Sequence, residues 1–325
     1  MNITRRDLLK GAIAALPLAR SNFSVASLAG SNFGGVQIGI IISPYNYAEI
    51  PVRADETLKT LVQLGISAFE MQDVRAEVYA GAPSQPREGY SGSAHGPQGT
   101  SPSPQERQEA RRKAAEELRA WRLAAPLDKY EALRKLYSDA GVNIYAFRLA
   151  NLATAASDEE FSYYFRAAQA LGANQITVEL PNDASLSQRL GEFGAKYKIR
   201  IGYHNHTQVD EHSWDGALSQ SSYNGINLDV GHYAAATNQS PIPFIKEHRD
   251  RITSLHLKDR KFRTNGGRNT PWGEGDTPLK EILQLVKAQR YPFPAAIELE
   301  YRIPADSSAT AEIAKCLQFC RDALA

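Results

Sequence analysis

The sequence has few cysteines, almost no net charge and no long apolar run, and each of these shortages excludes a class of protein. Cys316 and Cys320 are the only cysteines among 325 residues, and they lie four positions apart on a predicted terminal helix. That spacing puts both thiols on one helix face and does not favour a disulfide between them. We therefore interpret them as small core residues rather than as part of a disulfide framework.

The first 29 residues are typical of an export signal. The segment TRRDLLK (residues 4–10) contains the adjacent Arg5 and Arg6, and it is followed by the apolar run GAIAALPLA and by the small residues of SLAG. This order predicts a signal peptide over 1–29, and the paired arginines resemble the twin-arginine signal. The nine-residue run is too short to cross about 30 Å of hydrocarbon as a helix. We expect export to the periplasm or beyond by the twin-arginine machinery, without stable membrane insertion.

The balance of charge argues against nucleic-acid binding. The chain has 37 basic and 36 acidic side chains and a formal charge of +1, and removal of residues 1–29 takes away four bases and one acid, which leaves −2. Proteins that bind a phosphate backbone need a basic surface. We therefore expect no nucleic-acid partner, whereas association into a homo-oligomer is left open by the sequence.

From residue 36 onward, short β-rich segments alternate with amphipathic segments. Eight segments are typical of buried strands: 36–42, 67–71, 142–147, 175–180, 199–204, 225–230, 252–258 and 295–300. Six are typical of helices: 54–65, 128–141, 158–172, 185–198, 277–289 and 308–324. Several of these end in a glycine, the usual left-handed helix stop. Alternating units of this kind predict an α/β fold, a (β/α)8 TIM barrel, as one domain over residues 30–325.

Residues 74–126 interrupt this alternation. They contain a tract rich in Gly, Ser and Pro, followed by the charged helical pattern QERQEARRKAAEELRAWR. An insertion of this length after the second strand is either disordered or a lid over the barrel mouth, and we favour the lid. The charges of the helical part are interpreted as a solvated face rather than as a nucleic-acid patch.

Five predicted strands end in an ionisable side chain: Glu179, His204, Asp229, His256 and Glu298. The C-terminal ends of all strands of a TIM barrel open onto one face, so these residues are expected to meet. Isolated buried carboxylates are unfavourable, and a bound cation would remove that problem. The set Glu179, Asp229, His256 and Glu298 suits one divalent metal ion, Mn²⁺ first, with Mg²⁺, Co²⁺ or Zn²⁺ as further options. The alternative is that each of these residues is an ordinary charge at a strand end, paired with Arg or Lys. This explanation is less favoured for all four residues together than for any one of them.

Six motifs, TVEL, GYHNH, LDVGH, LHLKD, GEGDTPL and AIELEY, follow one another in the second half of the chain. In this order they resemble the xylose-isomerase-like TIM barrels, a superfamily that includes sugar phosphate isomerases and epimerases, inosose dehydratases and a DNA-repair endonuclease branch. The resemblance covers residue 36 to the C-terminus. It implies that the same four residues bind the metal and that Glu179 and Glu298 act on the proton next to a sugar carbonyl.

Seven further residues are expected to contact a substrate: Glu70, His204, His206, His232, Lys258, Trp272 and Glu300. His232 follows Asp229 by three positions, as a substrate-binding histidine does in the resembling epimerases. The alternative is that His232 hydrogen-bonds a metal ligand and does not contact the substrate. Lys258 shares a strand face with His256 and is a plausible cation for a developing oxyanion. Glu300 shares a face with Glu298, so the two are easily confused as ligands.

Removal of a proton beside a carbonyl gives an enediolate, whose fate decides the reaction. Reprotonation on the opposite face gives an epimer, reprotonation at the adjacent carbon gives an isomer, and loss of a β-substituent gives an elimination. We predict a metal-dependent sugar isomerase or epimerase, with a lyase or dehydratase of keto-sugars or 3-keto-glycosides as the alternative. A non-catalytic sugar-binding protein and an endonuclease-type hydrolase are less favoured. Export would favour free sugars or glycosides over intracellular sugar phosphates.

Overall fold

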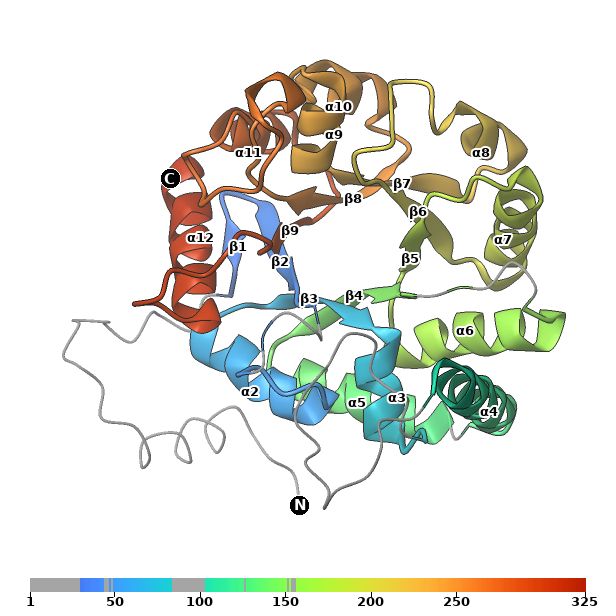
Figure 1. The fold of residues 1–325 in the computed structure, drawn as a ribbon. Helices are drawn as coiled ribbons and strands as arrows, with labels where there is room; N and C mark the ends of the chain where they lie inside the picture. Colours follow the sequence, from blue (N-terminus) through green and yellow to red (C-terminus); the bar gives the residue numbers. More distant parts are fainter. Residues whose placement is uncertain are drawn as a thin grey trace, which may run out of the picture.

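The computed structural model describes residues 30–43, 47, 49–83, 103–125, 127–150, 152 and 156–325. Eight parallel strands of this part form a closed barrel surrounded by helices (Figure 1). The strands are β2 (Val36–Ile41), β3 (Ala68–Gln72), β4 (Asn143–Arg148), β5 (Gln175–Glu179), β6 (Arg200–His204), β7 (Asn224–Asp229), β8 (Ile252–Leu257) and β9 (Ala295–Glu298). Each strand pairs with the next, and β9 pairs with β2 to close the barrel. The predicted TIM barrel is confirmed.

The helices of the described residues are α2 (Ala54–Leu64), α3 (Asp73–Ala80), α4 (Pro104–Leu123), α5 (Leu127–Asp139), α6 (Asp158–Leu171), α7 (Ala184–Tyr197), α8 (Asp215–Gln220), α9 (Val230–Thr237), α10 (Ile242–His248), α11 (Leu279–Gln289) and α12 (Ala309–Ala323). The six predicted helices are present as α2, α5, α6, α7, α11 and α12. Gly65 and Gly172 end α2 and α6 with φ of 74° and 76°, as expected of left-handed caps. The helices α3, α8, α9 and α10 have only six to eight residues, too few for a 3.6-residue period to stand out in the sequence.

Most apolar side chains of the strands and of the inward helix faces form one large core, and Ala68, Tyr145, Ala146 and Ala296 form a second, small cluster. Strands β7 and β8 are buried along their whole length, as expected of parallel strands covered by helices. Cys316 and Cys320 are buried free thiols on α12, which confirms their interpretation as core residues. In the part of the chain that is described, no helix is both long and apolar enough to cross a membrane.

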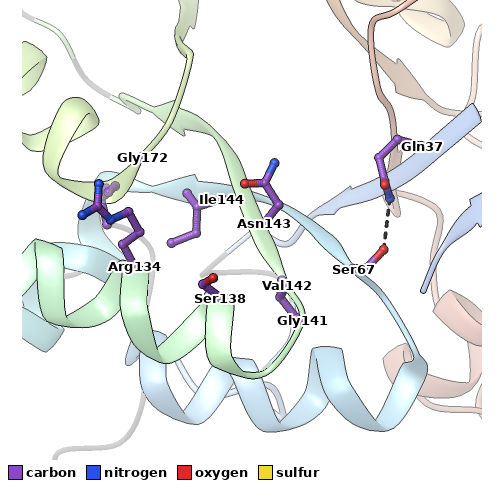
Figure 2. Close-up of a pocket in the computed structure, with 10 residues that line it drawn as sticks. Gln37, Ser67, Arg134, Ser138, Gly141, Val142, Asn143, Ile144 and Gly172 are labelled. Atoms are coloured by element: carbon purple, nitrogen blue, oxygen red, sulfur yellow. Dashed lines mark hydrogen bonds between the residues drawn. The ribbon is translucent and has the colours of Figure 1, made fainter. Parts of the chain in front are cut away.

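The N-terminal end of the barrel carries a short strand that was not predicted. β1 (Asn32–Phe33) pairs antiparallel with the start of β2. Beside it, Ser31, Gln37 and Ser67 are joined by hydrogen bonds. The pocket in Figure 2 lies at this end of the barrel, where Asn143 and Ile144 begin β4 and Arg134 projects from α5. This end is opposite to the one at which the predicted site residues gather.

The charged helix of the insertion lies at the side of the barrel, and a role of the insertion as a lid stays a prediction. α4 lies outside the ring of helices, beside α6, and none of its residues is buried (Figure 1). Arg122 pairs with Glu77 of α3 at 2.7 Å, and Arg119 pairs with Glu160 of α6 at 2.9 Å. The exposure of α4 fits its interpretation as a solvated helix. The start of the predicted insertion 74–126 forms most of α3, and its residues 84–102 and 126 lie outside the described residues.

Candidate functional site

His256 lies at the centre of the ionisable side chains at the C-terminal end of the barrel. Its Nε2 is 2.8 Å from Oε2 of Glu70, and its Nδ1 is 2.9 Å from Oε2 of Glu298. Burial alone lowers the pKa of His256, but the two carboxylates outweigh burial and raise the pKa to about 10. The ring is therefore fixed at both nitrogens and is positively charged at neutral pH.

Glu70 lies behind His256 and not at the barrel mouth, where we expected a substrate contact. Its side chain is fully buried, and its oxygens accept hydrogen bonds from the hydroxyls of Tyr145 and Thr177. Burial raises the pKa of Glu70, but the charge of His256 outweighs it and the net shift is downward. A carboxylate at one nitrogen of a histidine commonly orients the ring for a metal at the other nitrogen. Glu70 is thus a positioning residue for His256.

Lys258 places an ammonium group among three carboxylates. Its Nζ is 2.8 Å from Oδ2 of Asp229, 3.2 Å from Oε2 of Glu298 and 2.8 Å from Oε2 of Glu300. The residue is only 2% exposed. Burial favours the neutral amine, but the carboxylates dominate and raise the pKa of Lys258. Lys258 is therefore a fixed positive charge within the cluster.

Asp229 ends β7 and caps α9. Its Oδ1 accepts a hydrogen bond from the backbone N–H of His232 at 2.7 Å. Gly231 permits this close packing, because a Cβ there would collide with the carbonyl of Lys258. The buried Oδ2 forms an ion pair with the Lys258 ammonium at 2.8 Å. Burial raises the pKa of Asp229, and Lys258 opposes that shift.

Two neutral imidazoles flank the cluster. His204, the last residue of β6, is 1% exposed, and its Nδ1 is 2.7 Å from Oδ1 of Asn227. His232 has its Nε2 2.9 Å from Lys258 Nζ and its Nδ1 2.8 Å from a guanidinium nitrogen of Arg260. Burial lowers the pKa of both histidines, so both are uncharged at neutral pH.

Glu179 lies apart from these residues, on the outer side of His204. Its carboxylate forms an ion pair with Arg148 at the end of β4, and Nε2 of His206 is 3.7 Å away. The side chains of Glu179 and His206 are 44% and 55% exposed. We did not predict Arg148 as a site residue, although it directly follows the apolar segment 142–147 and therefore ends a strand as the others do.

Glu300 lies at the edge of the cluster, whereas Trp272 packs on a helix. The carboxylate of Glu300 contacts Lys258, whereas Glu298 is the one that reaches His256. Trp272 packs edge-on against Phe319 of α12, with ring centroids 5.6 Å apart and an interplanar angle of 85°. This contact accounts for its partial burial by packing on a helix, and a substrate contact by Trp272 stays a prediction.

Asp259 shapes the loop that follows β8. Its carboxylate accepts three backbone hydrogen bonds, at 2.8, 3.0 and 3.3 Å, from Gly273, Gly275 and Thr277. The loop also carries Arg260, which contacts His232, and Arg263, which donates to the carbonyl of Thr207 at 2.9 Å. Arg260 is a second site residue that we did not predict; the basic run after LHLKD was its only sequence signal.

Four side chains are placed to hold one metal ion. His204, Asp229, His256 and Glu298 each offer a ligand atom, and these atoms lie within 4.8 Å of one another. Two imidazoles and two carboxylates are suitable ligands for a divalent transition metal. Oδ2 of Asp229 already faces a cation, the Lys258 ammonium at 2.8 Å, so this oxygen is placed where a positive charge is stabilised and a metal ion would share or replace that contact. A second group, Glu179, His204 and His206, adjoins the first through His204.

A closed parallel barrel with carboxylates and imidazoles at the C-terminal ends of its strands has the architecture of the TIM-barrel enzymes, whose sites lie on that face. The chain belongs to the xylose isomerase-like TIM barrel family, whose sequence pattern matches residues 114–322. No curated protein matches the chain.

Three solved structures are similar to this chain. A sugar phosphate isomerase/epimerase from Parabacteroides distasonis has a TM-score of 0.58 and 16% identity, over 94% of this chain and 100% of that one. A 3-keto-D-glucoside 4-epimerase from E. coli has a TM-score of 0.56 and 11% identity, over 88% and 99%. A probable 3-DHS dehydratase from Bacillus anthracis has a TM-score of 0.54 and 13% identity, over 80% and 90%. At these identities the likeness establishes the fold alone.

The position of Lys258 gives a first prediction. Its ammonium contacts Asp229 and Glu298, two members of the four-residue group, so an added cation must compete with it. Lys258→Met should therefore tighten Mn²⁺ binding at least about tenfold, or about 1.4 kcal/mol. It should also lower the melting temperature of the metal-free protein, because buried carboxylates lose their counter-ion. Calorimetric titration and thermal unfolding measure the two effects.

Lys261→Met is the matched control, because Lys261 follows on the same loop but pairs with Asp276 at 3.4 Å. It should leave both quantities nearly unchanged. Weaker Mn²⁺ binding by Lys258→Met would show that Lys258 supports the metal site and does not compete with it.

Proposed function

We propose that this protein is a divalent-metal-dependent sugar isomerase or epimerase that removes the proton next to a carbonyl. The observation that carries the proposal is the convergence of Asp229, His256 and Glu298 at the C-terminal end of the barrel. Membership of the xylose isomerase-like family supports it. A divalent ion, Mn²⁺ in the first place, would polarise the carbonyl and acidify the neighbouring C–H group.

Glu179 and Glu298 are the proposed pair for proton transfer. They end β5 and β9, which lie on opposite sides of the eight-stranded barrel, so a sugar between them would have one carboxylate near each face. Burial raises the pKa of Glu298, but Lys258 and His256 outweigh burial and hold the pKa well below its usual range. Glu298 is therefore ionised at neutral pH and able to accept a proton.

The remaining polar residues would bind and orient the sugar. Lys258, already charged, is placed to stabilise negative charge on the carbonyl oxygen. His206 and Glu300 are partly exposed and offer hydrogen-bonding groups to hydroxyls at the mouth. The neutral His232, beside Lys258, is the proposed contact of a further hydroxyl.

A metal-dependent lyase is the second candidate, because the same first step begins a β-elimination. The contact of 2.9 Å between Lys258 and His232 favours it, since an imidazole that could contact the leaving substituent would lie beside the cation that stabilises the enediolate. Keto-sugars and 3-keto-glycosides are the substrates that such an elimination would take.

Incubation of the Mn²⁺-loaded protein with a panel of sugars, keto-sugars and keto-glycosides in D₂O tests the function. Deuterium at the carbon beside the carbonyl, with the substrate mass otherwise kept, would support isomerisation or epimerisation. Loss of a substituent would favour the lyase. Sugar binding without exchange or product would identify a non-catalytic binding protein.

The metal can be tested without a substrate. Asp229→Asn and His256→Ala should each abolish stoichiometric Mn²⁺ binding in equilibrium dialysis while the far-UV circular dichroism stays close to that of the parent. Asp210→Asn, a change at an exposed carboxylate that hydrogen-bonds Ser213 in a loop outside the cluster, is the control and should keep the metal. Full metal content in both site variants would remove the assignment.

The proton-transfer roles predict a kinetic result. Glu298→Gln keeps an oxygen but removes the base, so turnover and deuterium exchange should fall by about 10² to 10⁴, while substrate binding weakens less. Glu179→Gln should show a fall of the same order. Exchange at the parental rate in both variants would exclude both residues as the base and leave His204, His232 or Glu300.

Export is proposed from the sequence, since residues 1–29 lie outside the described residues. A twin-arginine route moves folded chains and would let the metal bind before export. Replacement of Arg5 and Arg6 with Lys should keep the precursor inside the cell, as measured by fractionation and by its larger mass. A Lys10→Arg variant is the control and should be exported normally. Normal export of the double variant would contradict this route.

A further inference from the structure

The four-residue group differs from the set expected from the sequence by one residue. His204 stands in the group with Asp229, His256 and Glu298, where Glu179 was expected. Among the described residues, Glu179 groups instead with His204 and His206. The question is which of these two strand-end residues completes the proposed metal centre.

A row of side chains across three strands fixes the ring of His204. In the strand register, His204 faces Asn227, and Asn227 faces Ser254. The amide nitrogen of Asn227 donates to Oγ of Ser254 at 2.7 Å, which turns its Oδ1 toward Nδ1 of His204, also at 2.7 Å. An amide oxygen only accepts, so Nδ1 carries the ring proton and Nε2 keeps its lone pair. This is the tautomer that a metal ligand requires.

The rings of His256 and His204 lie next to each other. Their ring centroids are 4.7 Å apart with an interplanar angle of 51°. The Nε2 of His256 is occupied by Glu70, so its Nδ1 is the nitrogen that faces Glu298. Each of the two histidines therefore has one nitrogen held by a buried neighbour and the other directed into the group, where a metal would displace the proton that the charged His256 ring carries on Nδ1. That arrangement repeats the support that proteins commonly give to metal-bound imidazoles.

Arg148 holds Glu179 away from this group. Its side chain is 10% exposed and forms the ion pair with the Glu179 carboxylate, and its Nη1 is buried without a hydrogen bond to any described residue. The carboxylate itself is 44% exposed and lies on the outer side of His204. A carboxylate that is held at the mouth by a guanidinium, and not by a metal, stays accessible to substrate.

We infer that His204 is the fourth protein ligand of the metal and that Glu179, held by Arg148, stays outside the ligand set and serves only in proton transfer. The inference rests on the metal dependence proposed above. Two nitrogen and two carboxylate ligands would favour Mn²⁺, Fe²⁺, Co²⁺ or Zn²⁺ over Mg²⁺, which prefers oxygen ligands.

Pulsed EPR of the Mn²⁺-loaded protein, with histidine labelled by ¹⁵N, counts the imidazoles bound to the metal. The parent should show couplings from two imidazoles. His204→Gln should remove one of them and weaken Mn²⁺ binding at least about tenfold. Glu179→Gln should keep both couplings and bind Mn²⁺ within about threefold of the parent, since its carboxylate is not a ligand.

His206→Gln is the matched control, because His206 lies next to Glu179 but outside the four-residue group; it should keep both couplings. The inference is overturned by a single imidazole coupling in the parent, which needs no variant to be folded, or by loss of Mn²⁺ from Glu179→Gln with retention in His204→Gln. The proposed function survives those results. Failure of the parent to bind Mn²⁺, Co²⁺ or Zn²⁺ at all would overturn the proposed function and this inference together.

Discussion

The pairing of β9 with β2 is the constraint on which the site depends. It joins Ile41 to Glu298 in register and converts an open sheet into a closed barrel. Only then do the ends of β3, β8 and β9 face a common centre, so that Glu70 and Glu298 reach the two nitrogens of His256. Two carboxylates separated by more than two hundred residues thus hold one imidazole, and the barrel end is fixed by side chains as well as by backbone pairing.

Charge neutralisation explains the order of the side chains around that centre. Glu70, Asp229 and Glu298 are mostly buried, and an isolated buried carboxylate is strongly unfavourable. The imidazolium of His256 and the ammonium of Lys258 supply two positive charges to these acids. Arg148 does the same for Glu179 nearer to solvent. Glu70, Asp229 and Glu298 therefore share the buried cations His256 and Lys258, whereas Glu179 has Arg148 as a separate cation. This difference is the basis for the separate roles that we infer for Glu298 and Glu179.

The fold could be predicted from the sequence because its signals are periodic. Every predicted strand segment overlaps one barrel strand, and the six amphipathic segments are helices, because burial on both faces of a parallel sheet leaves a clear apolar pattern. The convergence of Asp229, His256 and Glu298 follows from the same topology, since all parallel strands end on one face. Short helices such as α9 were missed because two turns carry too little pattern.

Depth along a strand and side-chain direction could not be predicted. Glu70 follows an apolar run just as Glu298 does, but it lies two residues before the end of β3 and is fully buried, with hydrogen bonds from Tyr145 and Thr177. The choice between Glu179 and His204 depends on partners in neighbouring strands, Arg148 and Asn227, that are remote in sequence. The packing of Trp272 could not be predicted for a similar reason, because its aromatic contact, Phe319, lies in the last helix, α12.

The attachment of α4 has a consequence for how this protein can diverge. The helix touches the barrel through a few side chains, among them Arg119 and Arg122, and buries none of its own residues. Substitutions on such a surface usually change stability by less than about 0.5 kcal/mol. Exposed positions of α4 can therefore be substituted with little effect on the stability of the barrel. The surface of α4 can change in this way while the barrel interior stays the same.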